Sequence, residues 1–530
     1  MKKIVAMLLA LTMLFALAAC GGSGSGQSGQ AGSSDSSQSG QADNSGSAGS
    51  DSSSTSDGSY PVIRVAYSRM FSTDSEGAIE DALNEIMREE AQAEIDLIPL
   101  DFSSMSTQLN LMLSGGSDSI DIFSSFWYLP LNTLHANGQL AALDDLLSSE
   151  APEVLDLFKD YPEVLDCCRI DGKLYALPTV GPYSSPMFYL VKETDAVNAG
   201  VSFDGVDTLD DLTPVLLQMK EANPDKYYIP GAVETYWVPK DIDYLGDTNL
   251  LSVLTDPTNS TTLENYYESD YFANFLENVK VWAENGIISP DSMSNTNPTL
   301  MSIQTGITSG SPGYGWDLDE WLYEANIQYD ANGIGQYGDR MTGTVIGDRL
   351  ITTGNVTTYL WHITSFCSNP EAAMRVLKVF YTNDDAANLL GNGIEGENYV
   401  VNDDGTIAFP EGKDMTNCGW TGLGASYNLP NSSGCPVWYY QPTDMWEMMD
   451  DTNQAAKPSL ALGFTYDDTS VADQVTACSN VIAQYYLPLI NGEVNVDEIL
   501  PVFQQALRDA GIEAIIAERQ AQLDAWLANK

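Results

Sequence analysis

The chain has 530 residues, of which 43% are hydrophobic and 10% aromatic, so it is long enough for two or more lobes with real cores. Its 74 acidic and 22 basic residues give a formal net charge of −52. Because a charge of this sign is repelled by phosphate backbones and by anionic membrane surfaces, it argues against nucleic acid as a partner and suits a domain held off a cell surface.

The N-terminus has the pattern of a secretory signal. Two lysines, Lys2 and Lys3, precede an apolar run from Ile4 to Leu17, and small residues follow. The run is shorter than the ~20 residues of a stable membrane span. The sequence Leu17-Ala18-Ala19-Cys20 resembles the lipobox of bacterial lipoproteins. The resemblance implies that residues 1–19 are removed and that Cys20 carries a lipid anchor on the outer face of the cytoplasmic membrane.

A polar linker follows the anchor. Residues 21–59 are almost entirely Ser, Gly, Gln, Ala and Asp, with no apolar periodicity. Such a segment cannot offset the entropy of ordering, and as a flexible coil it would reach ~35 Å. We therefore expect residues 20–59 to be a lipid-anchored tether and the folded part to begin at Tyr60.

The first folded segment alternates strands and helices. Strands are predicted at 62–67, 95–100 and 119–123, and helices at 76–91 and 105–113. This order predicts right-handed crossovers and a parallel sheet, in which ligands bind beyond the carboxyl ends of the strands. Those ends carry Tyr67-Ser68-Arg69 and the run Ser124-Ser125-Phe126-Trp127-Tyr128.

Further elements are predicted along the rest of the chain. An apolar stripe from Phe272 to Trp282 indicates a helix that ends at Asn285-Gly286. Asn369-Pro370-Glu371 is a helix start, with Asn369 as a side-chain cap. A hairpin turn is predicted at 402–405, and amphipathic helices are predicted at 471–487, 497–510 and 512–527.

Three motifs in succession resemble one protein family. They are Ile120-Asp121-Ile122-Phe123 with Trp127, Gly138-Gln139-Leu140 with Leu143–Leu147, and Asp171–Pro178. This order is similar to that of the substrate-binding lipoproteins of bacterial ABC importers, in the maltose-binding-like class. Residues 369–406 resemble one branch of that family, whose C-terminal region is undescribed and which is often linked to complex-carbohydrate uptake.

The resemblance covers about residues 60–530 and implies an α/β, two-lobed periplasmic-binding-protein-like fold (type II). Each lobe would hold a mostly parallel sheet flanked by helices, with a cleft between the lobes. The expected first lobe comprises 60–183 and 346–395, and the second comprises 184–345 and 396–530. Leu300–Thr308 with Ser311–Trp316 resembles the second-lobe strand whose following loop offers an aromatic ring to sugar, and Arg349–Phe366 resembles the return strand.

Aromatic residues are the most informative candidates for a binding site, since the chain has 10 Trp and 27 Tyr. Sugar rings stack on Trp and Tyr, and their hydroxyls bond to polar side chains. Trp127 and Trp316 match the family's sugar-stacking positions by motif, while core packing is the alternative for every candidate. The predicted ligand-binding residues are Tyr67, Arg69, Ser125, Trp127, Tyr128, Tyr183, Trp237, Tyr314, Trp316, Asp317 and Trp361.

The sequence contains few motifs for catalysis, metal binding or cofactor binding. Two G-x-G-x-x-G matches, at 333–338 and 391–396, do not lie between a strand and a helix, as dinucleotide binding requires. His135 and His362 are the two histidines, and the seven cysteines match no zinc spacing. Cys418 and Cys435 could form a disulfide. We expect no enzyme activity, no cofactor and no metal.

The predicted function is capture of a carbohydrate, expected to be an oligosaccharide, and its delivery to the permease subunits of an ABC transporter, by a monomer anchored through Cys20. Two alternatives stay open. A binder of peptides or another solute on the same fold would differ only in the chemistry of the cleft. A surface glycosidase would need two carboxylates ~5–9 Å apart, which no local pattern singles out.

Overall fold

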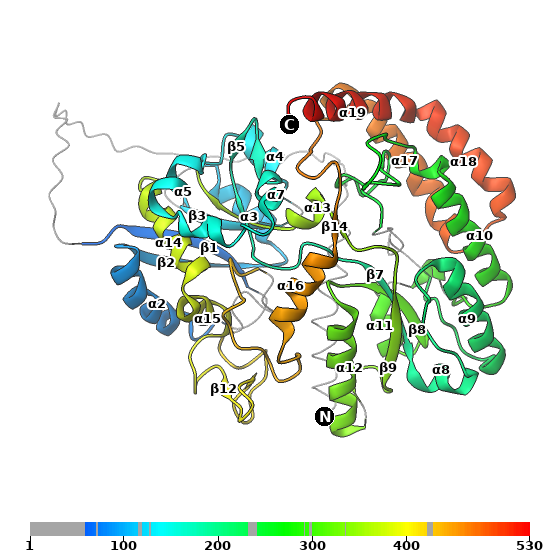
Figure 1. Cartoon of the computed structure of the whole chain (residues 1–530), viewed down its shortest axis with the longest axis horizontal. Helices are drawn as coiled ribbons and strands as arrows, with labels where there is room; N and C mark the ends of the chain where they lie inside the picture. The colour runs from blue at the N-terminus through cyan, green and yellow to red at the C-terminus, as the bar shows by residue number, and fades with distance from the viewer. Residues whose placement is uncertain are drawn as a thin grey trace, which may run out of the picture.

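The computed structural model describes residues 59–69, 73–114, 119–126, 129–231, 241–290, 292–295, 299–333, 335–420 and 428–530. These residues form two lobes that lie side by side, each with a β-sheet, flanking helices and a buried core (Figure 1). The two-lobed α/β fold predicted from the sequence is confirmed. Cys20 and the linker lie outside the described residues, so the tether stays a prediction.

The first lobe is built on a five-stranded sheet in the order β2-β1-β3-β11-β6. Its central strand β1 pairs in parallel with β2 and β3, and β11 runs antiparallel to β3 and β6. The third strand begins at Ile122, later than predicted. Asp121, just before it, accepts the Arg64 N–H with its side-chain carboxylate at 2.9 Å. The strands are β1 (Val62–Arg69), β2 (Glu94–Asp101), β3 (Ile122–Phe126), β6 (Leu177–Pro178) and β11 (Tyr359–Ile363).

Helices cover both faces of this sheet and include the predicted pair at 76–91 and 105–113. The hairpin of β4 (Arg169–Ile170) and β5 (Lys173–Leu174) turns at Asp171 and Gly172, which both have positive φ, as a two-residue turn requires. The helices are α2 (Glu76–Glu90), α3 (Met105–Met112), α4 (Leu131–Ala136), α5 (Asp144–Glu150), α6 (Glu153–Asp156), α7 (Pro162–Asp166), α13 (Thr353–Val356), α14 (Pro370–Thr382) and α15 (Asp384–Asn392).

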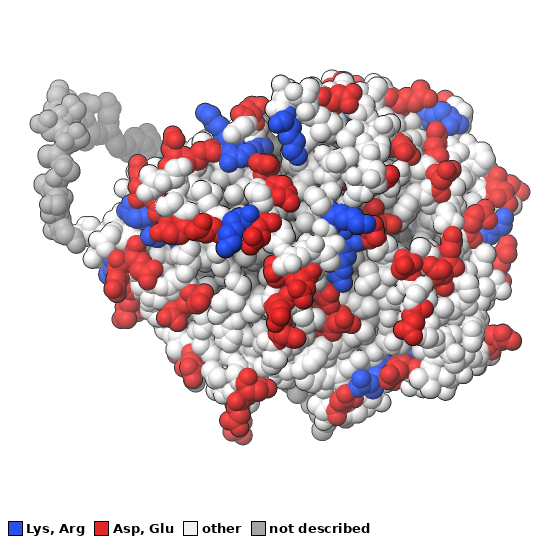
Figure 2. All heavy atoms as spheres, viewed as in Figure 1, with Lys and Arg blue, Asp and Glu red and all other residues white. Residues whose placement is uncertain are grey.

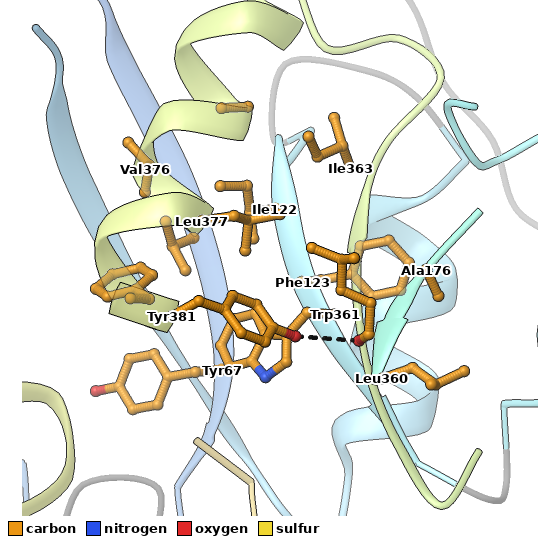
Figure 3. Packing of buried hydrophobic residues seen from close by; sticks show 14 of the residues in the cluster. Tyr67, Ile122, Phe123, Ala176, Leu360, Trp361, Ile363, Val376, Leu377 and Tyr381 are labelled. Carbon is orange, nitrogen blue, oxygen red and sulfur yellow. Dashed lines mark hydrogen bonds between the residues drawn. The ribbon is translucent and has the colours of Figure 1, made fainter. Parts of the chain in front are cut away.

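The core of the first lobe lies between α14 and the sheet (Figure 3). Val376, Leu377 and Tyr381 of α14 pack against strand residues, and the Tyr381 hydroxyl donates to the carbonyls of Leu177 (3.2 Å) and Pro178 (2.9 Å). α14 begins at Pro370 as predicted, but the predicted side-chain cap by Asn369 is not formed, and the Asn369 amide donates to the Ser368 hydroxyl at 3.2 Å.

The second lobe has a three-stranded sheet in the order β8-β7-β9, and both pairings are antiparallel. The expectation of mostly parallel strands is therefore wrong for this lobe. The strand β7 enters from the first lobe and β9 leads back to it, so the two must run in opposite directions. Thr299–Gln304 forms a helix rather than part of the strand. The strands are β7 (Met187–Lys192), β8 (Gly310–Tyr314) and β9 (Met341–Ile346).

Helices form the outer edge of the second lobe (Figure 1). The predicted helix at 272–282 is present and ends before Gly286, which has φ +64°. The three predicted C-terminal helices are also present. The helices are α8 (Glu193–Ala199), α9 (Leu209–Ala222), η2 (Tyr266–Glu268), α10 (Asp270–Glu284), η3 (Ser292–Ser294), α11 (Thr299–Gln304), α12 (Leu318–Asn332), η4 (Thr469–Val471), α17 (Ala472–Ile490), α18 (Val496–Ala510) and α19 (Ile512–Leu527).

Several segments run between the lobes. β10 (Leu350–Ile351) pairs in parallel with β14 (Lys457–Pro458), and α16 (Met445–Ala455) precedes β14. The predicted hairpin turn joins β12 (Val400–Val401) to β13 (Ile407–Ala408). Trp420, Leu429 and Cys435 belong to the core cluster of the first lobe, although the predicted boundaries put them in the second. The boundaries themselves stay a prediction.

All six cysteines in the described residues are free, so Cys418 and Cys435 are not joined. Cys418 is buried and its thiol donates to the Trp420 carbonyl at 2.9 Å. Among the helices that the structure describes, none is long and apolar enough to cross a membrane.

Candidate functional site

Two predicted residues, Trp316 and Asp317, lie where β8 ends and α12 begins. Gly315 allows this tight approach, because a Cβ at that position would clash with the indole of Trp321. Asp317 caps α12, and its Oδ1 accepts the N–H groups of Asp319 (2.8 Å) and Glu320 (3.3 Å). The local sequence thus holds the Trp316 ring at the start of a helix in the second lobe.

The second oxygen of Asp317 bonds to other segments. Its Oδ2 accepts from Arg349 Nη2 at 3.0 Å and from the Thr452 hydroxyl at 3.2 Å. Arg349 also donates to the Trp316 carbonyl at 2.8 Å. Both oxygens of this carboxylate are therefore engaged within the protein, and their bonds join α12 to the segment after β9 and to α16.

The helix α16 lies at the junction of the lobes (Figure 1). On one side, its Asn453 donates to the Gly181 carbonyl and accepts the Tyr183 N–H, at 2.9 and 2.8 Å. Asp450 accepts from the Tyr161 hydroxyl at 2.9 Å. On the other side, Thr452 reaches Asp317. α16 therefore bonds to the first lobe, to the first crossing segment and to the second lobe.

The ring of Trp316 is covered by this helix. It is 5% exposed and clusters with Val437, Met445 and Met449. Tyr183, another predicted residue, is buried beside Tyr161, with ring centroids 5.5 Å apart. The structure thus brings Trp316, Asp317 and Tyr183 to the junction, and it packs both rings against protein.

Ser125 lies in β3 and is buried against a histidine. Its hydroxyl is 2.8 Å from Nε2 of His362, whose Nδ1 lies 3.2 Å from the Tyr175 carbonyl. Because a carbonyl only accepts, Nδ1 carries the proton and Nε2 accepts from Ser125. Burial lowers the pKa of His362 to about 4, so the ring is neutral at neutral pH. Its two hydrogen bonds and its burial therefore give this histidine a structural role.

Other predicted residues are placed in the core or at the surface. Tyr67 and Trp361 are fully buried in the first lobe, where Tyr67 donates to Glu76 (3.1 Å) and Trp361 donates to the Asn428 carbonyl (3.0 Å). Arg69 pairs with Asp101 at 2.8 Å. Tyr314 is half-buried and packs against the core of the second lobe. Trp127, Tyr128 and Trp237 lie outside the described residues.

A pocket of about 220 Å³ lies elsewhere, at the end of β7 far from the junction. Lys192, Lys226 and Tyr227 are among the residues that line it. In the described part of the chain, no group of three or more His, Cys, Asp or Glu side chains is placed to hold a metal ion. Acidic side chains are scattered over the face seen in Figure 2, with few basic ones between them.

Comparison with family models gives a match over residues 72–387, well over half of the chain, to the bacterial extracellular solute-binding protein family. The chain belongs to this family. A second model, described as a domain of unknown function (DUF3502), matches residues 460–528 of this solute-binding protein, which include α17, α18 and α19.

Similar proteins cover nearly the same length. A carbohydrate ABC transporter substrate-binding protein of Streptococcus pneumoniae is 25% identical over 89% of this chain and 92% of its own. The crystal structure of the N-glycan transport solute binding protein NgtS from Streptococcus pneumoniae has a TM-score of 0.74 and 22% identity, covering 88% of this chain and 99% of that one. An HMO binding, ABC-transporter associated solute binding protein from Bifidobacterium longum infantis has a TM-score of 0.60 and 16% identity, covering 88% of this chain and 99% of that one.

One group of residues at the junction was missed by the sequence predictions. Trp438, Tyr439 and Tyr440 follow each other in the segment before α16, and Tyr439 is 47% exposed. Three consecutive aromatics outside any amphipathic helix are a signal that could have been found. This solute-binding protein therefore presents aromatic surface near the junction from a segment other than the one predicted.

Proposed function

We propose that this protein is a lipid-anchored extracellular binding protein that captures an oligosaccharide between its lobes and delivers it to the permease subunits of an ABC importer. No bond of the ligand is broken. The tether of residues 20–59 keeps the binder near the membrane, where a high effective concentration lets a weak contact with the permease suffice.

The observation that carries the proposal is similarity to a carbohydrate-binding relative over most of the chain. The Streptococcus pneumoniae relative named as a carbohydrate transporter protein aligns with about nine-tenths of both chains. Solved neighbours on the same fold include NgtS in complex with Man5GlcNAc, at a TM-score of 0.61. Oligosaccharide is therefore the ligand class that we propose for this chain.

The geometry at the junction supports a binder that closes by hinge motion. β7, β9 and the strand pair β10–β14 belong to the segments that run between the lobes, and α16 bonds to both sides. Hinge motion between two separate cores is absorbed by a few loop or element-terminal residues, and each of these crossing segments ends in such residues. The predicted residues Trp316, Asp317, Tyr183 and Ser125 are proposed to lie at or near the site that closure shapes.

Calorimetry of the purified protein tests the proposal. We expect heat of binding, and a raised melting temperature, with at least one member of a panel of high-mannose N-glycan and milk-type oligosaccharides. Binding to peptides with no response to any glycan would overturn it in favour of the other solute class. Turnover of nitrophenyl glycosides would overturn it in favour of a glycosidase.

A further inference from the structure

An aromatic platform stands beside α12. Trp438 stacks on Tyr440, with ring centroids 6.1 Å apart and an interplanar angle of 16°, and its other neighbour Phe409 is 4.4 Å away. Tyr439 meets Tyr440 edge-on at 5.2 Å. These four rings, Phe409 with Trp438–Tyr440, form the aromatic platform. Tyr439 is about half exposed, so the platform has a face that a ligand can reach.

The platform is held by the first lobe. Trp438 Nε1 donates to Asn392 at the end of α15, at 3.2 Å, and Trp438 bridges to Ile407 of β13. Aromatic side chains fixed in this way lose little entropy when a sugar stacks on them, because they are already ordered.

Two carboxyl groups on the second-lobe helix α12 lie near the platform. Val437, which precedes Trp438, packs against Trp316 at the start of α12, and Glu324 acts on the charge of Tyr439 and Tyr440. Glu320 and Glu324 are one helical turn apart, so they lie on the same face of α12. Glu320 is 5% exposed, and neither residue takes part in an ion pair in the described chain. The Glu324 carboxylate receives one long bond, from Gln328 at 3.5 Å.

The phenols around this pair belong to two segments. Burial and then Glu324 raise the pKa of Tyr440 and of Tyr337 above the usual range, which places both phenols within the field of the pair. The hydroxyl of Tyr337 is buried and has no hydrogen-bond partner among the described residues. A buried hydroxyl without a partner is costly unless a ligand completes its bonds.

We propose that the aromatic platform and the Glu320–Glu324 pair form an oligosaccharide subsite, in which a sugar ring stacks on Tyr439 while its hydroxyls bond to the two carboxyl groups. This inference rests on the proposed function and deepens it. The subsite joins a first-lobe surface to a second-lobe helix, so its ligand bridges the lobes. It also supplies the accessible aromatic face that Trp316, covered by α16, does not.

Protonation gives the pair both donor and acceptor capacity. Burial, with Glu324 and Asp317 nearby, raises the pKa of Glu320 to about 8, and burial raises the pKa of Glu324 to about 7. The other titratable groups facing the pair are Tyr337, Tyr439 and Tyr440, while Asp317 is bound to Arg349. At neutral pH the pair keeps a proton, which suits sugar hydroxyls that both donate and accept.

The first test is the affinity of variants for the tightest glycan of the panel, measured by calorimetry at pH 6.5. Tyr439→Ala should weaken binding about tenfold, the scale expected for losing one stacked ring. The matched control is Phe366→Ala, since Phe366 is also exposed (37%) but follows the opposite end of the first-lobe sheet. An unchanged Kd for Tyr439→Ala would overturn the subsite.

The second test is the pH profile of binding. Because a stacked sugar excludes water from the pair, it favours the protonated form, and Kd should rise about tenfold from pH 6 to pH 9. Glu320→Gln keeps the shape without the charge and should flatten this profile. Asp319→Asn, which changes an exposed acid on the same helix, should keep it. A parallel profile for wild type and Glu320→Gln would contradict the inference.

The proposed function and the proposed subsite are overturned by different results. If the wild-type protein binds no glycan at all, the proposed function is overturned and the subsite with it. If the wild type binds a glycan while Tyr439→Ala and Glu320→Gln bind it equally well at every pH, the function stands and the subsite is overturned.

Discussion

Substitution of Asp317 tests whether its carboxylate contacts a ligand directly or only holds Trp316 and the start of α12 in place. It was predicted from the sequence as a ligand-binding residue, yet both its oxygens are used within the protein. Its carboxylate has 11% side-chain exposure, and that of its partner Arg349 has 22%, so solvent screens this ion pair only weakly. We therefore predict that Asp317→Ala acts first on stability.

The magnitude follows from the bonds that are lost. Removing an N-cap costs about 1 kcal/mol. Losing a charge-assisted hydrogen bond from a largely buried arginine adds about 2 kcal/mol, although Arg349 keeps its bond to the Trp316 carbonyl. We expect Asp317→Ala to lower the free energy of unfolding by about 3 kcal/mol. Asp317→Asn keeps an oxygen that can cap α12, so only the charge is removed. We expect it to lower the free energy of unfolding by about 2 kcal/mol.

Urea unfolding followed by tryptophan fluorescence measures these changes, and calorimetry with glycan measures binding on the same samples. A positioning role predicts that Asp317→Asn retains binding within a few-fold, because Trp316 keeps its place. The reasoning is refuted if Asp317→Ala unfolds like the wild type but no longer binds glycan. That result would mean that the carboxylate contacts the ligand directly.

Three further predictions concern stability and anchoring. Arg519 is 1% exposed and pairs with Asp247 (2.6 Å) and Asp468 (2.6 Å), so Arg519→Met should cost about 3 kcal/mol in urea unfolding by leaving the buried Asp247 and the partly buried Asp468 unpaired. The exposed pair of Lys280 with Asp497 is the control, and Lys280→Met should leave the urea midpoint nearly unchanged, because solvent screens this pair. Since the folded pKa of His362, about 4, lies below its ordinary 6.5, its neutral form favours folding above pH 6.5. This contribution, about 3 kcal/mol, is lost as the pH falls from 6.5 through 4, so His362→Gln should show a smaller loss of stability between pH 7 and pH 4.5 than the wild type. Cys20→Ser should release a binder with unchanged glycan affinity into the medium and lower glycan uptake by cells; unchanged uptake would show that the tether is incidental.

Much of the fold could be predicted because the signals are local. The helices α2, α10 and α17–α19 have apolar faces repeating at helical spacing, and that periodicity exists within each segment. The direction of β7 relative to β8 and β9 has no such signal. It depends on which strands enter and leave the second lobe, and the expectation of parallel pairing was wrong there.

The candidate site could be predicted only in part. The motif around Trp316 and Asp317 was found because it resembles the family pattern, and the structure places both residues at the junction. Tyr67 and Trp361 are predicted as ligand-binding residues because they lie on or near strand ends, but packing from α14, Trp420 and Asn428 buries them. A strand end is exposed or covered according to segments that are distant along the chain.

The sequence by itself determined the class of this protein: two α/β lobes, a family of extracellular solute-binding proteins and an aromatic-rich surface. Only the tertiary structure decided which aromatic faces a ligand can reach. Trp316 is covered by Val437 and by α16, while Tyr439 stays about half exposed near Glu324. Exposure and pKa depend on contacts between residues more than 100 positions apart, and no local pattern encodes such contacts.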